Sequence, residues 1–268
     1  MSQADPKPPA ALAASDLSTG YPGALIIDGL DLEIPRATFT ALVGPNGCGK
    51  STLLRAVARL QPLHRGTVLL DGRAIAQQST KEIARQVGIL PQAPEAPEGL
   101  SVADLVRQGR YPHRALFGRW AEADARACAD ALDVTGLTSL QDRPLDSLSG
   151  GQKQRAWIAM TLAQQTAMLL LDEPTTYLDL AHQLEVLDLL RALVKEQGAT
   201  VVAVLHDLNQ AARYADHIVM MKDGAILAEG APDATVTQAR IEAVFDIKAM
   251  VMPNPVDGTP LMIAVTRR

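Results

Sequence analysis

The feature that most constrains the fold is the segment at residues 44–51, GPNGCGKS, which matches the pattern G-x-x-x-x-G-K-S/T. An apolar run, Thr38–Val43, precedes it, and a segment with helical character, Ser51–Leu60, follows it. Between a strand and a helix, glycines let the backbone curl so that successive N–H groups and the helix N-terminus face an anion. The segment therefore predicts an α/β protein with a phosphate-binding loop, rather than an ordinary glycine-rich turn.

The residue types in this loop predict separate chemical roles. Lys50 is expected to reach the β- and γ-phosphates of a nucleotide, and the Ser51 hydroxyl is expected to coordinate Mg²⁺. Cys48 could be a redox residue, but a small side chain filling a tight loop is the better interpretation, because nothing nearby offers a second thiol. The predicted nucleotide contacts in the loop are Gly44, Pro45, Asn46, Gly47, Cys48, Gly49, Lys50, Ser51 and Thr52.

Composition limits the class of protein. The 268 residues are 47% hydrophobic and 21% charged, as in a globular domain with a proper core. A net charge of −5 argues against nucleic acid as a partner. The two cysteines are too few for a disulfide framework, and a reducing cytoplasm suits them. Because no apolar run approaches the roughly 20 residues of a membrane span, we expect any membrane attachment to come through partner proteins.

Strand-like and helix-like segments alternate over much of the chain, which favours a mostly parallel sheet. Short apolar segments broken by glycine and proline predict an antiparallel β subdomain near the N-terminus. After Gln92 the sequence becomes helical, with no convincing strand before residue 166. We expect a disordered leader at 1–10, an α/β core at 11–92 and 166–230, an inserted helical subdomain at 93–165, and a C-terminal extension of the core at 231–268.

Polar residues follow two of the expected strands. The apolar segment Met168–Leu171 ends in Asp172 and Glu173, and His206 follows another apolar segment. The carboxyl ends of parallel strands meet at the ligand-binding edge of such a sheet. Alone, an acidic strand end is usually a solvated turn and a single histidine is usually structural. Downstream of a phosphate loop, we expect Asp172 to hold Mg²⁺, Glu173 to polarise an attacking water and His206 to contact the γ-phosphate.

A second glycine-containing motif, LSGGQ at residues 148–152, lies in the helical part of the chain. Ser149 is predicted to be a helix N-cap, and the helix start offers a second anion-binding terminus. With this motif the sequence resembles the ABC ATPase family over nearly its whole length. In that family the LSGGQ segment of one subunit closes over ATP held by its partner. The resemblance implies that a second copy of the chain contacts ATP through Ser149, Gly150, Gly151 and Gln152.

Further landmarks of the family occur in the expected order. Tyr21 resembles the aromatic residue that stacks on adenine, although it could be a simple turn tyrosine. Gln92 resembles the glutamine that senses Mg²⁺ or water and links the two lobes. Asp179 resembles the aspartate that crosses the subunit interface, although Thr176-Tyr177 stands where many relatives have Ser-Ala. The resemblance thus implies Mg²⁺ ligation by Ser51, Gln92 and Asp172, and catalysis by Glu173, His206 and Gln92.

Three segments, at 109–113, 175–179 and 206–211, resemble the importer branch that serves ferric siderophores, haem and cobalamin, and most of all ferric-siderophore ATPases of the catecholate type. The resemblance implies integral membrane permease subunits as partners, a substrate-binding protein as an indirect one, and a peripheral location at the cytoplasmic face of the inner membrane. The region 107–120 is expected to be a docking surface for the permease, or simply a basic exposed face. Its basic and aromatic residues are Arg107, Arg110, Tyr111, His113, Arg114, Phe117, Arg119 and Trp120.

A different class of protein remains as an alternative, namely a soluble ABC ATPase of DNA repair or translation. The repair type needs a long coiled-coil insertion, and no sustained heptads occur between Gln92 and Ser149. The translation type carries two cassettes, whereas this chain has one phosphate loop. A GTPase would need an N-K-x-D guanine motif, which the sequence lacks. The importer interpretation is therefore preferred.

Overall fold

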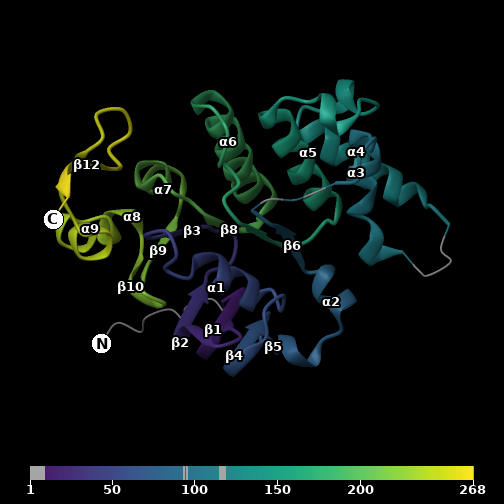
Figure 1. Ribbon diagram of the computed structural model, residues 1–268. Helices are drawn as coiled ribbons and strands as arrows, with labels where there is room; N and C mark the ends of the chain where they lie inside the picture. Colours follow the sequence, from purple (N-terminus) through teal and green to yellow (C-terminus); the bar gives the residue numbers. More distant parts are fainter. Residues whose placement is uncertain (1–9, 93, 95, 115–118, 268) are drawn as a thin grey trace, which may run out of the picture.

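The computed structural model describes residues 10–92, 94, 96–114 and 119–267. The expected leader at 1–10 lies outside these residues except for its last position. The described chain forms a central six-stranded sheet with helices on both faces, a four-stranded sheet below it, and a two-stranded hairpin near the C-terminus (Figure 1). Within these residues, no helix combines the length and apolar character that a membrane crossing requires.

The N-terminal sheet is antiparallel and has the strand order β2-β1-β4-β5. Its turns follow local sequence: Asp71 and Gly72 have φ of 50° and 75° and join two paired strands, as an Asp-Gly hairpin turn requires. This sheet lies across α1 from the central sheet (Figure 1). Its strands are β1 (Leu12–Tyr21), β2 (Ala24–Ile34), β4 (Leu63–Leu70) and β5 (Arg73–Ala74).

The central sheet has the order β10-β9-β3-β8-β7-β6, and all neighbouring pairs except β10–β9 are parallel. Every residue of β3, β7 and β8 is buried. Strands covered on both faces read as continuous apolar runs, which is why these segments do not alternate in polarity. The bounds are β3 (Phe39–Val43), β6 (Val87–Leu90), β7 (Met168–Leu171), β8 (Thr200–Val204), β9 (His217–Lys222) and β10 (Ala225–Gly230).

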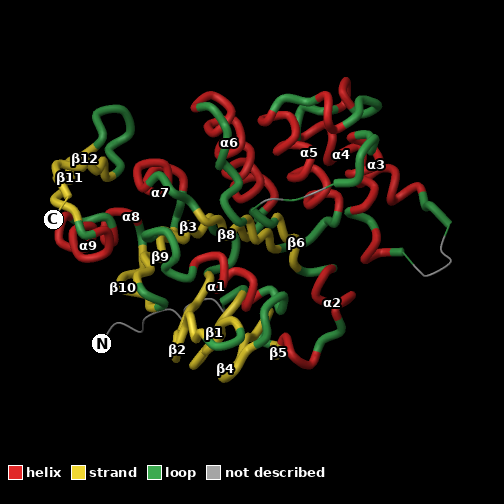
Figure 2. Tube along the Cα trace, in the orientation of Figure 1, coloured by secondary structure: helices red, strands yellow, loops and turns green. Residues whose placement is uncertain are grey.

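Three helices between β6 and β7 pack on one another and form the inserted helical subdomain. They are α3 (Val102–Gln108), α4 (Glu122–Val134) and α5 (Gly150–Ala163), and Figure 2 shows this part of the chain as helices joined by loops. The core contributes α1 (Lys50–Val57), α2 (Thr80–Ala84), α6 (Leu180–Gln197) and α7 (Leu208–Tyr214). The chain ends with α8 (Pro232–Thr235), α9 (Gln238–Phe245), β11 (Ile247–Pro253) and β12 (Pro260–Arg267).

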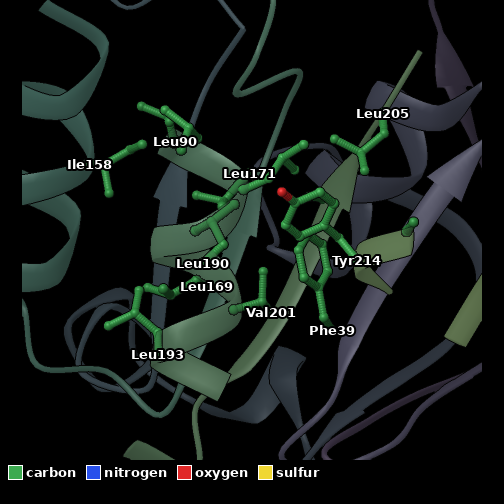
Figure 3. Close-up of a cluster of buried hydrophobic side chains, with 14 of the residues drawn as sticks. Phe39, Leu90, Ile158, Leu169, Leu171, Leu190, Leu193, Val201, Leu205 and Tyr214 are labelled. Atoms are coloured by element: carbon green, nitrogen blue, oxygen red, sulfur yellow. The ribbon is translucent and has the colours of Figure 1, made fainter. Parts of the chain in front are cut away.

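The two faces of the central sheet bury separate apolar clusters. Alternate residues of β3 show this, because Phe39 belongs to the cluster with α5, α6 and α7, and Leu42 belongs to the cluster with α1 and the N-terminal sheet. In Figure 3, Phe39 from the sheet lies beside Tyr214 of α7, and Leu169 lies near Leu190 of α6. This packing fixes the strand ends from which the predicted site residues project.

Candidate functional site

The phosphate-binding loop lies between β3 and α1, as the sequence predicts. Gly49 has φ of 105° and is the N-cap of α1, a backbone conformation that favours glycine. Gly44 approaches another strand so closely that a Cβ there would lie 2.2 Å from the Met221 carbonyl oxygen. Both glycines are therefore required by geometry, and the loop backbone curls toward the start of α1.

Lys50 is buried inside this loop. Its Nζ donates hydrogen bonds to the carbonyl oxygens of Gly44 and Pro45, each at 2.8 Å. A buried ammonium group needs such partners. A phosphate bound here would replace these two carbonyls as partners of Lys50, because phosphate oxygens offer stronger charge-assisted bonds.

Cys48 is also buried, and its Sγ lies 3.9 Å from Lys50 Nζ. Burial raises the pKa of the Cys48 thiol, although the nearby Lys50 charge acts in the opposite direction. A raised pKa disfavours the reactive thiolate. The environment is that of a small side chain filling the loop.

Ser51 and Asp172 meet across 121 sequence positions. Ser51 Oγ donates a hydrogen bond of 2.8 Å to Asp172 Oδ1, where β7 delivers its last residues beside α1. Burial raises the pKa of Asp172, and the Ser51 bond partly offsets this. A hydroxyl and a carboxylate oxygen are hard ligands of the kind that Mg²⁺ takes alongside nucleotide phosphates. These two residues therefore fit a magnesium ion.

Glu173 and His206 form the second polar pair at this sheet edge. His206 Nε2 lies 2.8 Å from Glu173 Oε2, and Thr176 Oγ1 donates to the same oxygen at 3.0 Å. Burial acts to raise the pKa of Glu173, but hydrogen bonds from His206, Gln92 and Thr176 outweigh it and hold the pKa below its usual value. Glu173 is thus kept as a carboxylate that can accept a proton.

A pocket of about 480 Å³ is lined by Lys50, Ser51, Glu173 and His206, whereas Asp172 is not among its lining residues. We call it the nucleotide pocket, and its volume suits a small-molecule ligand. Tyr21, 43% exposed, lies on its wall, where an aromatic ring could meet a base. The pocket is lined by Tyr21, Ile26, Asn46, Gly47, Gly49, Lys50, Ser51, Thr52, Gln92, Glu173 and His206.

Neither the LSGGQ residues nor Asp179 lines the nucleotide pocket. Ser149 is the N-cap of α5 and accepts a hydrogen bond from Gln152 N, and Gln152 Oε1 accepts one from Ser149 N in return. Asp179 is the N-cap of α6, with 67% of its side chain exposed. A Cβ at Gly150 would lie 3.8 Å from Tyr177 O, so the two caps are neighbours. We call residues 149–152 and 176–180 the signature surface.

The structure adds residues that sequence reasoning missed and corrects one expectation. Thr176 binds Glu173, and Ile26 lines the nucleotide pocket from β2, although its position in a strand gave no sign of this. Arg110 was expected on a permease-docking surface, and this is wrong. It is 4% exposed, donates to Asp124 Oδ1 at 2.9 Å and to Ala163 O at 2.7 Å, and so holds the helical subdomain together.

Other residues of the expected docking region do lie at the surface. Tyr111 is 66% exposed, and the Arg114 guanidinium lies 5.7 Å from the ring centroid of Trp120. Arg85 of the core donates to Pro112 O at 2.8 Å and thereby ties this region to the α2 end of the core. Phe117 falls at 115–118, outside the described residues.

Comparison with known proteins gives consistent matches. The sequence profile described as ABC transporter matches residues 27–176. Petrobactin import ATP-binding protein FpuD of Bacillus anthracis is 52% identical over 253 residues, 94% of this chain and 93% of its own. Ferric enterobactin transport ATP-binding protein FepC of Escherichia coli strain K12 is 49% identical over 258 residues, which are 96% of this chain and 95% of its own. The dimeric structure of MJ0796, a bacterial ABC transporter cassette, superposes with a TM-score of 0.73 at 26% identity, over 82% of this chain and 98% of that one.

Proposed function

The chain belongs to the ABC transporter family as an ATP-hydrolysing subunit, and we propose that two copies, arranged head to tail, bind ATP between them and drive the import of ferric siderophores. One observation carries the pairing: the nucleotide pocket contains the phosphate loop and catalytic carboxylate, whereas the signature surface lies outside it. A second copy supplies what the pocket lacks. The dimeric form of the related cassette supports this arrangement.

The chemistry follows from the residues of the pocket. Lys50 leaves the Gly44 and Pro45 carbonyls and binds the β- and γ-phosphates of ATP. Ser51, Asp172 and Gln92 would hold Mg²⁺, which would neutralise charge on the phosphates when bound. Glu173 takes a proton from the attacking water, and His206 contacts the γ-phosphate. The partner's Ser149, Gly150, Gly151, Gln152 and Asp179 close over the same nucleotide.

Closure of the pair draws the two helical subdomains together, and hydrolysis releases them. We propose that integral membrane permease subunits dock on this chain at the cytoplasmic face of the inner membrane, follow this movement and receive cargo from a substrate-binding protein. The boundaries proposed for the moving parts are 93–165 for the helical subdomain and 11–92 with 166–230 for the core, extended by 231–268.

Cargo is proposed from the relatives. The two relatives above are named for petrobactin and ferric enterobactin, and are 52% and 49% identical to this chain. Two different siderophores at similar identity favour the class of ferric siderophore over any single compound. Haem or cobalamin is the alternative cargo within the same branch of importers.

Crosslinking tests the head-to-tail pairing directly. Asn46→Cys in one copy and Ser149→Cys in another place thiols on the nucleotide pocket and on the signature surface, while both native cysteines are buried. We expect a crosslink between copies when both variants are mixed with ATP and Mg²⁺. Each variant alone is the control. No crosslink at any protein concentration would overturn the pairing.

An uptake assay tests the cargo. Cells that make the chain with its membrane partners should accumulate ferric siderophore only when the chain is intact. Cells that make the Glu173→Gln variant should not accumulate it. Loss of haem or cobalamin uptake, with ferric-siderophore uptake unchanged, would overturn the cargo proposal and leave the ATPase mechanism in place.

A further inference from the structure

The His182 side chain lies between the two parts of the signature surface. It is in the first turn of α6, and its ring Nδ1 donates a hydrogen bond of 2.7 Å to Asp179 Oδ1. The His182 backbone N–H donates to the same oxygen at 3.0 Å. His182 therefore fixes the rotamer of Asp179, although the Asp179 side chain is 67% exposed.

The His182 ring also lies against Gly151 of the LSGGQ segment. A Cβ at Gly151 would lie 2.5 Å from His182 Cδ2 and 2.7 Å from Cγ, closer than real contacts allow. Gly151 is inside α5 and has no positive φ, so backbone conformation does not require glycine there. Glycine within a helix costs about 1 kcal/mol relative to alanine. The contact with the His182 ring gives a physical reason for glycine at this position.

A second link joins the same two helices about one turn further along. The Arg155 guanidinium of α5 pairs with the Glu185 carboxylate of α6. α5 belongs to the helical subdomain and α6 to the core. The beginnings of the two helices are thus held in register by one ring contact and one ion pair.

We propose that His182 is a positioning residue that ties Asp179 to the LSGGQ helix, so that both reach the partner's nucleotide as one unit. This inference rests on the proposed pairing of two copies. Its physical basis is conformational entropy, because an exposed carboxylate free to rotate has to be ordered each time the pair closes. His182 orders it beforehand, within each copy. Hydrogen bonds from the His182 backbone and ring also keep the pKa of Asp179 below its usual value, so the carboxylate stays charged.

Three substitutions at position 182 separate positioning from packing. His182→Ala and His182→Leu remove the ring bond to Asp179 and leave the backbone N–H bond, and we expect kcat for ATP hydrolysis to fall about tenfold in both. His182→Asn places an amide N–H near the position of Nδ1, and we expect it to keep turnover within about threefold of the native chain. ATP affinity, set by the same copy's nucleotide pocket, should be unchanged in all three.

The matched control is His64→Ala, which changes an exposed histidine on β4, far along the chain from the signature surface. It should leave kcat unchanged. If His182→Leu is as active as His182→Asn, the ring acts only by packing and the positioning role is wrong. Full turnover by His182→Ala would overturn the proposal outright.

Double substitutions test each contact of the ring. Once Asp179→Ala is present, adding His182→Ala should lower kcat no further, because the two side chains act through the single bond from the ring to the carboxylate. Gly151→Ala should lower kcat, and His182→Ala should restore part of that loss by removing the atoms that the new Cβ meets. Additive losses in the first pair, or no restoration in the second, would contradict the corresponding contact.

The proposal and the pairing on which it rests fail in different ways. In the Glu173→Gln background, light scattering with ATP and Mg²⁺ shows whether copies pair at all. If they never pair, the proposed function fails whatever position 182 contains. If they pair, and chains that keep Glu173 hydrolyse ATP equally well with His, Ala or Leu at 182, only the positioning role of His182 fails.

Discussion

The nucleotide pocket and the signature surface differ in how their polar groups are satisfied. In the pocket, Lys50, Ser51 and Glu173 all have partners within the same chain. On the signature surface, Asp179 is 67% exposed and Tyr177 is 91% exposed. Two helices also begin there, and their N-termini carry positive potential.

This difference fits the proposed division of one catalytic site between two copies of the chain. The groups proposed to act on ATP are held in the pocket by internal hydrogen bonds, some of which would have to be exchanged when ATP binds. Groups on the signature surface are ordered only by helix caps and by His182, and their outward faces lie outside the pocket. Substitutions in the two regions should therefore separate ATP binding from turnover.

The largest effect should come from Glu173→Gln in the nucleotide pocket. Turnover is expected to fall about 1,000-fold, because an amide cannot accept the proton from water. ATP affinity should stay within about twofold, and the closed pair should accumulate. Phosphate release measures the first effect and light scattering the second. Glu229→Gln, at an exposed position on β10, is the control, and normal turnover in Glu173→Gln would remove Glu173 from catalysis.

Asp124→Asn should weaken the helical subdomain that carries the signature surface. Breaking its ion pair with Arg110, both side chains under 10% exposed, is expected to lower the free energy of unfolding by about 3 kcal/mol. Urea unfolding measures the loss. The control is Asp130→Asn at an exposed position of the same helix. If the two variants were equally stable, the buried pair would not be what holds this subdomain.

Lys50→Ala should act on ATP binding itself. Losing a charged donor to the phosphates is expected to weaken ATP affinity about 30-fold, or about 2 kcal/mol. Calorimetric titration measures this, with Lys195→Ala on the exposed end of α6 as the control. Undiminished affinity in the Lys50 variant would count against the phosphate assignment.

Ser149→Ala should do the reverse, lowering turnover about tenfold while ATP affinity in the same copy is unchanged. The substitution also removes a helix cap, which costs about 1 kcal/mol of stability. Ser101→Ala controls for this, because Ser101 caps α3 in the same way but lies outside the signature surface. Equal turnover in the two variants would mean that Ser149 acts only as a cap.

The smallest effect should be the pH dependence of the contribution that Asp124 makes to the free energy of unfolding. Hydrogen bonding by Arg110, the largest cause, holds the pKa of Asp124 below its usual value of 3.8 despite burial. The unfolded chain therefore takes up this proton at a higher pH than the folded chain. The difference in free energy of unfolding between the native chain and Asp124→Asn should have its full value above the pKa of Asp124 in the unfolded chain. It should decline as pH falls through the pKa of Asp124 in the folded chain. Urea midpoints from pH 7 downward measure it, and a constant difference would contradict the assignment.

Much of the fold was predictable because its signals are local. The loop at 44–51, the Ser149 cap of α5 and the apolar strand Met168–Leu171 all lie where their residues predict. The sequence did not reveal β6, because its four residues include a glycine and are too few to show a periodic pattern. Gly88 in that strand is explained only by packing, since a Cβ there would lie 2.8 Å from Thr161 Cγ2.

The roles predicted for individual site residues depend on contacts of a different kind. The sequence indicated that Asp172, Glu173 and His206 end strands, but not that Ser51 would bind the first and His206 the second. Arg110 looked like a surface cation among other basic residues, yet the partner that buries it lies on another helix. No spacing rule along the chain encodes that pairing.

The sequence alone determined the elements whose geometry is set within a few residues, namely the curled phosphate loop, the serine cap of α5 and the apolar strands that carry polar residues at their ends. Backbone sterics and short-range hydrogen bonds decide these. Only the tertiary structure decided which ends meet, which cation is buried, and that the His182 ring lies on Gly151. Those contacts depend on strand order and helix packing, because they join side chains that are remote along the chain and adjacent only after folding.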